Sequence, residues 1–155
     1  MVLRSQLSAA LVVRGDELLY QSRDERALQF YQRALVFDPN NAAAADRYVF
    51  VSMMGHRRDG LERAVETASK YLAKHASDVT LLMDRALCER ALARDGAAEE
   101  DFVRAGLASR DARAMVFAGY AALRQGKRTR ARHWWHVALT LISDYVPAER
   151  ALRLR

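Results

Sequence analysis

Apolar residues recur every three or four positions along most of the chain, with polar residues between them. The stretch LQFYQRALVFDPNN, residues 28–41, shows this pattern and its end, because Pro39 disfavours helix at the residue before it. No segment alternates apolar and polar residues with a period of two between hairpin turns. The pattern predicts an all-α fold with helices at residues 5–21, 24–37, 42–55, 60–75, 79–93, 97–109, 112–125 and 128–143, and a short ninth helix after Pro147.

The chain repeats a short motif in which an alanine is followed by an aromatic residue four positions on and a second alanine three positions later. A weaker copy has its aromatic residue displaced. The copies are Ala27-Tyr31-Ala34, the weaker Ala64-Ala68-Tyr71, Ala98-Phe102-Ala105 and Ala131-Trp135-Ala138. Their leading alanines recur at intervals of about 34 positions, which is the period of a helix–turn–helix repeat.

Further residues strengthen the first and fourth copies. Gly15 precedes Ala27 by the same interval at which Pro39 follows it, and Gly119 precedes Ala131 by that interval as well. The period and the pattern resemble the tetratricopeptide repeat (TPR), a helix–turn–helix unit of about 34 residues. The resemblance implies an α-solenoid of about four repeats, at residues 8–41, 42–78, 79–111 and 112–145, in a single domain 1–155 with a capping segment at 146–155.

The motif also makes a packing prediction. A small residue lets the second helix of a pair approach the first closely, and the aromatic residue one turn on fills the space between them. We therefore expect Tyr31, Phe102 and Trp135 to be buried. The second copy is slightly longer than the others, and we expect its extra residues in the turn GHRRDG, residues 55–60.

The net charge of +6 is unevenly distributed. Residues 103–155 hold 11 basic and 3 acidic residues, 11 − 3 = +8, whereas residues 1–102 hold 14 and 16, 14 − 16 = −2. A basic C-terminal third offers an alternative function, the binding of nucleic acid or of an acidic partner. Scattered basic residues on a helix face are more often a solvated surface than a binding site. We therefore regard nucleic-acid binding as the less favoured interpretation of this charge.

Cysteine content and hydropathy indicate the compartment. Cys88 is the only cysteine, which excludes a disulfide framework and suits a reducing cytosol. The apolar stretch at residues 9–13 is too short for a signal peptide, and residues 114–123 span about half of what a membrane helix needs. We expect a cytoplasmic protein without membrane insertion, and the alanine- and arginine-rich composition is typical of GC-rich bacteria.

No catalytic constellation is evident, and we expect no enzymatic activity, cofactor, metal or small-molecule substrate. The segment GKRT, residues 126–129, lacks the glycine five positions earlier that a phosphate-binding loop requires. His133 and His136 lie near one helix face but have too few further ligands nearby for a metal. The acidic run at residues 99–101 is favourable at the positive end of a helix dipole, and Cys88 is interpreted as a buried small side chain. Trp134 either packs against the C-terminal segment or is exposed as a binding anchor.

In TPR proteins, the first helices of the repeats line a concave groove that binds a peptide or a partner helix. Transferred to this chain, the groove positions are mostly apolar, and they lack the lysines and asparagines with which some family members hold an acidic C-terminus. In the second repeat, the register leaves either Val49 or Phe50 at one position. The predicted partner-binding residues are Val12, Asp16, Asp46, Met53, Met83, Leu87, Arg90, Arg113, Val116, Tyr120 and Arg124.

The resemblance and the groove together indicate a non-catalytic protein–protein interaction module. As an adaptor, scaffold or small chaperone, it would bind an apolar or amphipathic segment with some acidic residues. The small TPR chaperones of type III protein secretion are similar in size and also hold apolar segments. We further expect the apolar members of this set to form one continuous exposed strip: Val12, Met53, Met83, Leu87, Val116 and Tyr120. No motif specifies an oligomeric state.

Overall fold

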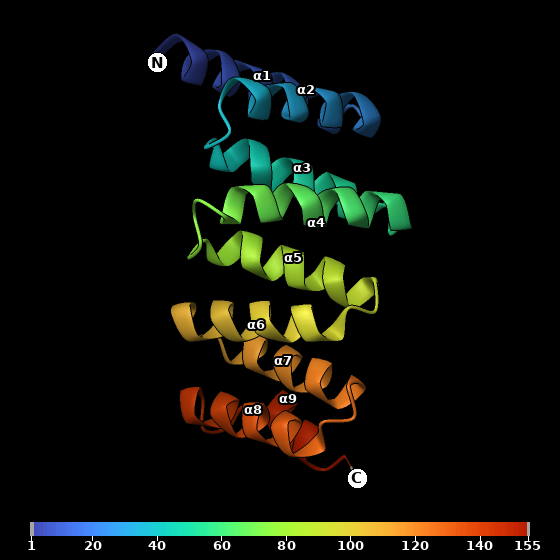
Figure 1. Cartoon of the computed structure of the whole chain (residues 1–155), viewed down its shortest axis with the longest axis vertical. Helices are drawn as coiled ribbons and strands as arrows, with labels where there is room; N and C mark the ends of the chain where they lie inside the picture. The colour runs from blue at the N-terminus through green and yellow to red at the C-terminus, as the bar shows by residue number, and fades with distance from the viewer. Residues whose placement is uncertain (1, 155) are drawn as a thin grey trace. The chain divides into compact units, whose positions relative to one another are not determined.

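The computed structural model describes residues 2–154, and within them it contains helices and no strand, which confirms the all-α prediction (Figure 1). The predicted helix ends lie close to the observed ones, and several coincide with them. The helices are α1 (Val2–Tyr20), α2 (Asp24–Phe37), α3 (Ala42–Met54), α4 (Arg58–Leu72), α5 (Val79–Ala91), α6 (Asp95–Ser109), α7 (Ala112–Arg124), α8 (Arg128–Leu141) and α9 (Val146–Leu152).

The repeat is visible in the backbone of the four turns that join the first and second helix of each pair. Each turn has three residues, and the middle residue adopts a positive φ: 58° at Ser22, 49° at His56, 59° at Ala93 and 76° at Gly126. Glycine adopts this conformation without strain, but only the fourth turn has a glycine at its middle position. The repeat is therefore present in the geometry even where the sequence does not show it.

The turn of the second repeat corrects one prediction. Only residues 55–57 separate α3 from α4, as in the other pairs, so the extra residues do not lie in this turn. They lie after α4, where residues 73–78 lead to α5; the corresponding connections at 38–41 and 110–111 are shorter. A connection outside the helix pair lengthens without disturbing the packing between the two helices.

Contacts between backbone segments divide the chain into two compact units. Unit 1 ends at His75 and contains α1–α4, and unit 2 begins at Ala76 and contains α5–α9. In unit 1, Tyr31 of α2 is buried against Gly15 of α1. A Cβ at Gly15 would lie 2.4 Å from the Cε1 atom of Tyr31, so the missing side chain lets the two helices approach closely.

In unit 2, a glycine of the first helix likewise lies against an aromatic ring of the second helix, here the larger indole of a tryptophan. A Cβ at Gly119 would lie only 2.1 Å from the Nε1 atom of Trp135, which is buried between α7 and α8. Phe102 of α6 is fully buried as well, so the burial of all three predicted aromatic residues is confirmed. Ala148 and Ala151 of α9 pack into the same core as Trp135, and the short helix covers the last pair as a capping helix.

Short polar residues fix where the first helices of the second, third and fourth repeats begin. The side chains of Asn41, Asp78 and Asp111 each accept a hydrogen bond from a backbone N–H in the first turn of α3, α5 and α7. The second helices have no such cap and instead follow directly from the three-residue turns. Because the first helices begin at fixed points, the residues along their exposed faces are also fixed.

Candidate partner-binding groove

Unit 2 has a groove between the first helices of its two pairs, α5 and α7, with a volume of about 670 Å³. We call it the α5/α7 groove. It brings together three residues that the sequence predicts for partner binding: Met83 and Leu87 of α5 and Arg113 of α7. The end of α6 and the turn after it close one side with Ser109 and Asp111.

The apolar part of the groove rests on the core of unit 2. Met83, Leu87 and Phe117 are partly buried and pack against the cluster around Phe102. The rings of Phe117 and Phe102 lie 5.4 Å apart between centroids. The apolar floor of the groove is therefore continuous with the core of unit 2.

Charged residues border this floor on both sides. Arg113 is exposed and lies 3.1 Å from the carboxylate of Asp111, which also caps α7. The guanidinium carbon of Arg90 lies 5.2 Å from the ring centroid of Phe117, a cation–π distance. Asp84 of α5 also lines the groove. The surface therefore combines an apolar floor with two arginines held in place by their neighbours.

Three further predicted residues of unit 2 do not line the groove and contact other helices of the unit instead. Val116 is only 4% exposed, so the expectation of an exposed side chain is wrong here: it packs in the core of α7 and α8. Tyr120 is partly buried, with its ring edge-on to Trp135 at 5.5 Å. Arg124 pairs with Asp95 at the start of α6, at 3.1 Å.

In unit 1, the predicted residues of α1 are likewise structural. Val12 is 8% exposed and belongs to the core, which again contradicts an exposed strip. Asp16 accepts a hydrogen bond from the hydroxyl of Tyr31 at 2.7 Å and pairs with Arg47 of α3 at 3.2 Å. Burial and then this bond to Asp16 raise the pKa of Tyr31 well above its usual value. Asp46 pairs with Arg47 at 3.4 Å.

The turns decide the register that the sequence leaves open in the second repeat. Arg57 and Lys127 directly precede α4 and α8, so they occupy equivalent points of two repeats. Counting back from them by equal steps matches Phe50 with Tyr120, and Met53 with Leu123. Phe50 is 43% exposed whereas Val49 is fully buried, so Phe50 occupies the outward-facing position.

Solved structures with the same fold are TPR proteins. A crystal structure of MamA matches with a TM-score of 0.81 at 16% identity over 95% of this chain and 79% of that one. PilF of Pseudomonas aeruginosa gives 0.66 at 20% identity, covering 96% and 74%. A TPR protein from Parabacteroides merdae gives 0.76 at 16% identity, covering 94% of this chain and 57% of that one. No protein-family model and no curated protein matches the sequence.

The chain has the TPR fold. The predicted resemblance is thus confirmed at the level of the fold, and identities of 16% to 20% carry it no further. Within this fold, the α5/α7 groove lies between the first helices of two adjacent repeats.

The sequence did not reveal two buried carboxylates on α6. Glu99 is 2% exposed; its carboxylate accepts hydrogen bonds from Trp134 Nε1 and from Gln125 Nε2, both at 2.8 Å, and pairs with Arg130. Asp101 is 3% exposed and pairs with Arg85 of α5 through two hydrogen bonds of 2.6 and 2.8 Å. Because α6 begins at Asp95, residues 99–101 lie beyond its first turn, and the expected placement at the positive end of the helix dipole is wrong. The sequence contains one signal for Glu99: this charged residue directly follows Ala98, the leading alanine of the third copy of the motif.

This network also settles the position of Trp134. The indole is partly buried and reaches α6 through its bond to Glu99, so it is a packing residue and not an exposed anchor. The hydrogen bond to Asp101 raises the pKa of Arg85, so the guanidinium stays charged.

Other candidate chemistry finds no support in residues 2–154. No group of three histidine, cysteine or acidic residues there could hold a metal. Cys88 is buried, and this burial raises the pKa of its thiol to about 12, which keeps it protonated and unreactive. Gly126 adopts its positive φ as the middle residue of a helix-pair turn, without any loop that could surround a phosphate.

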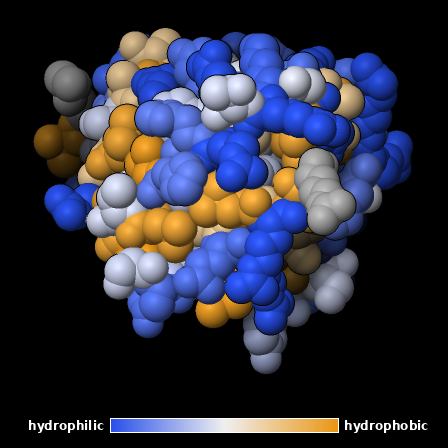
Figure 2. Space-filling model, turned by 90° about the horizontal axis from the view of Figure 1, so that it is seen from below, coloured by the Kyte–Doolittle hydropathy of each residue, from blue (hydrophilic) through white to orange (hydrophobic). Residues whose placement is uncertain are grey.

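Several basic residues of the C-terminal third have a polar or acidic partner. Seen from the side of α8 and α9, hydrophilic residues alternate with apolar ones (Figure 2). Arg113, Arg124 and Arg130 each pair with a carboxylate, and Arg132 donates to the backbone oxygen of Leu152 at 3.3 Å. Pairing lowers the positive potential that a nucleic acid would meet. Among the described helices, none is both long and apolar enough to span a membrane.

Proposed function

We propose that this protein is a non-catalytic interaction module that binds a segment of a partner protein in the α5/α7 groove. One observation carries the proposal: Met83, Leu87 and Phe117 together form a partly exposed apolar floor in a groove of about 670 Å³. Apolar surface that is held open by a rigid scaffold is typical of binding sites. The fold shared with TPR proteins supports the same function class.

The groove favours an apolar or amphipathic segment that carries one or more acidic residues. The apolar floor would cover the apolar side chains, and methionine adapts to irregular shapes because it is unbranched and flexible. Arg90, and Arg113 when it exchanges its exposed pair with Asp111 for one with the segment, would pair with carboxylates of the segment and fix its orientation. Along α5, the groove extends from Val79 to Leu87, about 12 Å at the helical rise, which matches three or four extended residues.

Within this class, we favour an adaptor or small chaperone that keeps an apolar segment of its partner covered. The support is the character of the floor: an apolar surface of this kind gains most from a partner that also has apolar surface to bury. A chaperone role predicts that the partner's segment aggregates more readily when it is alone.

The proposal can be tested with peptides, because the chemistry of the groove defines the ligand to expect. Random peptides of about 12 residues, long enough to cross the groove in extended form, would be displayed on phage and selected on the immobilised protein. Isothermal titration then measures the enriched peptides. We expect them to carry two or more large apolar residues and at least one acidic residue. Met83→Glu places a charge on the floor and should weaken their binding by at least about tenfold, or 1.4 kcal/mol.

A matched control is available in the same unit. Leu107 of α6 is exposed and does not line the groove, so Leu107→Glu makes the same change in charge without touching the site. Its affinity should stay within about twofold of the wild type. If the peptides bind Met83→Glu as tightly as the wild type while circular dichroism shows a folded protein, the groove is not the site. If enrichment yields only basic peptides, the proposed partner chemistry is wrong.

A further inference from the structure

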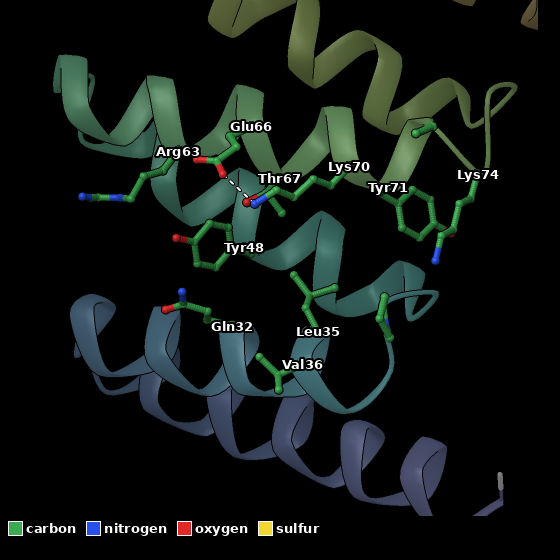
Figure 3. A pocket seen from close by; sticks show the side chains of 12 residues that line it. Gln32, Leu35, Val36, Tyr48, Arg63, Glu66, Thr67, Lys70, Tyr71 and Lys74 are labelled. Atoms are coloured by element: carbon green, nitrogen blue, oxygen red, sulfur yellow. Dashed lines mark hydrogen bonds and ion pairs between the residues drawn. The ribbon is translucent and has the colours of Figure 1, made fainter.

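Unit 1 has a hollow of its own between the second helices of its two pairs, α2 and α4, with a volume of about 670 Å³. We call it the α2/α4 pocket. Figure 3 shows Tyr48 of α3 between the two helices, with Leu35 and Val36 of α2 on one side and Thr67 and Tyr71 of α4 on the other. The pocket belongs to the second helices, whereas the α5/α7 groove belongs to first helices of the other unit.

The interior of the pocket is mostly apolar. Tyr48 and Tyr71 are largely buried and form a firm floor, while Val36 at the edge is 77% exposed. The ring of Tyr71 stacks on the ring of His75, with 4.3 Å between their centroids. A volume of this size lies in the range of about 300–1,000 Å³ that is typical of binding pockets. The pocket therefore suits an occupant with apolar side chains.

Cations follow one edge of the pocket along α4. Arg63 and Lys70 lie on this helix at helical spacing, and Lys74 lines the far end just after it (Figure 3). The row from Arg63 to Lys74 covers about three helical turns, or about 16 Å at the helical rise. The lining has one carboxylate, Glu66, which pairs with Lys70 on the surface, and Arg63 pairs with Asp59 at 3.3 Å. Exposed pairs of this kind are weak and exchange partners readily.

The length of this row distinguishes between different anionic occupants. A small anion, or the headgroup of a fatty acid, would meet one or two of the cations, because the three are distributed over about 16 Å. A helix of about 12 residues has nearly the same length and can place acidic side chains beside each cation and apolar ones in the pocket. Charge and shape thus favour an elongated acidic ligand.

We propose that the α2/α4 pocket binds an acidic amphipathic helix of a partner protein, at a site independent of the α5/α7 groove. The apolar face of the helix packs on Val36, Leu35 and Tyr48, and its acidic flank lies along α4. A protein with both sites can connect two partners, or hold two segments of one partner.

The test uses a fluorescently labelled synthetic helix of about four turns, a little longer than the row of cations. One version has leucines at helical spacing and glutamates on the flank, and a second has lysines in place of the glutamates. Fluorescence anisotropy should show saturable binding of the acidic peptide, at least about tenfold tighter than of the basic one. Val36→Asp should weaken binding by about tenfold, and Lys74→Glu by about fivefold, with a smaller effect at high salt.

Control variants distinguish binding in this pocket from loss of fold, from general charge attraction and from binding in the α5/α7 groove. Val36 and Lys74 are exposed, so both variants should keep the wild-type circular dichroism spectrum. Arg26 is an exposed cation of α2 outside the pocket, and Arg26→Glu should change the affinity by less than about twofold. Met83→Glu, which tests the α5/α7 groove, should leave binding of the acidic helix intact.

Four results would overturn the proposal. Equal affinity for the basic peptide would remove the role of the cations, and equal affinity of Val36→Asp would remove the role of the pocket. Loss of binding in Met83→Glu but not in Val36→Asp would place the peptide in the α5/α7 groove. Saturable binding of laurate that Val36→Asp abolishes, without binding of the acidic peptide, would assign the pocket to a small anionic amphiphile instead.

Discussion

The second helices of the two units meet in different ways. In unit 2, Trp134 and Arg130 of α8 reach the buried carboxylate of Glu99 on α6 and connect the two helices. In unit 1, the facing side chains of α2 and α4, such as Leu35 and Thr67, line a pocket of about 670 Å³. The same helix-pair geometry thus gives one connected face and one open face.

A few residues at equivalent positions account for much of this difference. Leu28 follows Ala27 as Glu99 follows Ala98. Ala64 of α4 occupies the same position in its helix as Trp134 does in α8, counted from the first residue of each helix. Leucine and alanine are too short and too apolar to form a hydrogen-bonded link between the helices. Turn geometry therefore fixes the repeat, while single side chains decide where a surface stays open for a ligand.

The largest effect should come from the aromatic position of the motif. Phe102 is fully buried in unit 2. Counted from the turn residues Arg94 and Arg57, the equivalent residue of the second repeat is Val65, so the copy led by Ala64 is out of register; Val65 is only partly buried. Phe102→Ala should lower the free energy of unfolding by about 3–5 kcal/mol, and Val65→Ala by about 1 kcal/mol. Urea denaturation of the two variants measures both values. Equal losses would mean that the two units are packed alike and would remove the contrast.

A close approach of two helices gives the next largest effect. Gly119→Ala would place a Cβ 2.1 Å from the indole of buried Trp135, and we expect a loss of about 2–3 kcal/mol from the resulting displacement. Gly55, in the turn of the second repeat, has no atom within 4 Å of such a Cβ and has a negative φ of −74°. Gly55→Ala should be neutral or slightly stabilising. Thermal unfolding of both variants tests the pair, and a neutral Gly119→Ala would refute the tight packing of α7 on α8.

Alkaline pH should also destabilise the protein, with a different group acting in each unit. Burial, followed by the bond to Asp16, raises the pKa of Tyr31 in unit 1 above its usual 10.0, and burial raises that of Cys88 in unit 2 from 9.0 to about 12. For a raised pKa, the stabilisation is complete below the unfolded-state value and is lost as the pH rises toward the folded-state value. Stability should therefore be constant to about pH 9 and fall above it.

Two variants separate these contributions. Cys88→Ala should remove the part of the decrease that begins near pH 9, and Tyr31→Phe the part that begins near pH 10. Urea denaturation at about pH 8, 9.5 and 11 gives the three points needed. An unchanged alkaline decrease in the double variant would show that neither group is as well buried in solution as in the structure.

The fold was predictable from the sequence because its main determinants are local. Small and aromatic residues at fixed spacing specify how the two helices of a pair pack, and Asp38-Pro39 marks where α2 ends. The middle residues of the turns were not predictable in the same way. Ser22, His56 and Ala93 adopt a positive φ that their residue types do not favour, because the packing of the helix pair imposes it.

The candidate site was predicted only in part. Met83, Leu87 and Arg113 lie in one groove, but Val12 and Val116 are buried because their positions on the first helix turn toward its own partner helix. A rotation of one residue along a helix, about 100°, is enough to exchange a groove position for a core position. The α2/α4 pocket was missed because it depends on the sizes of side chains from three helices, which no periodicity records.

The carboxylate of Glu99 joins α6 to α8 in unit 2. The equivalent residues of unit 1, Leu28 and Ala64, are too short and too apolar for this link, and a pocket lies between α2 and α4. The chain has two tryptophans, so hydrogen exchange of the two indole N–H groups, followed by NMR, reports on this link directly. We expect slow exchange at Trp134 in the wild type and at least about tenfold faster exchange in Glu99→Ala, with Trp135, which donates to the backbone oxygen of Val116, nearly unchanged. Exchange of Trp134 at the rate of free indole in the wild type would contradict the claim.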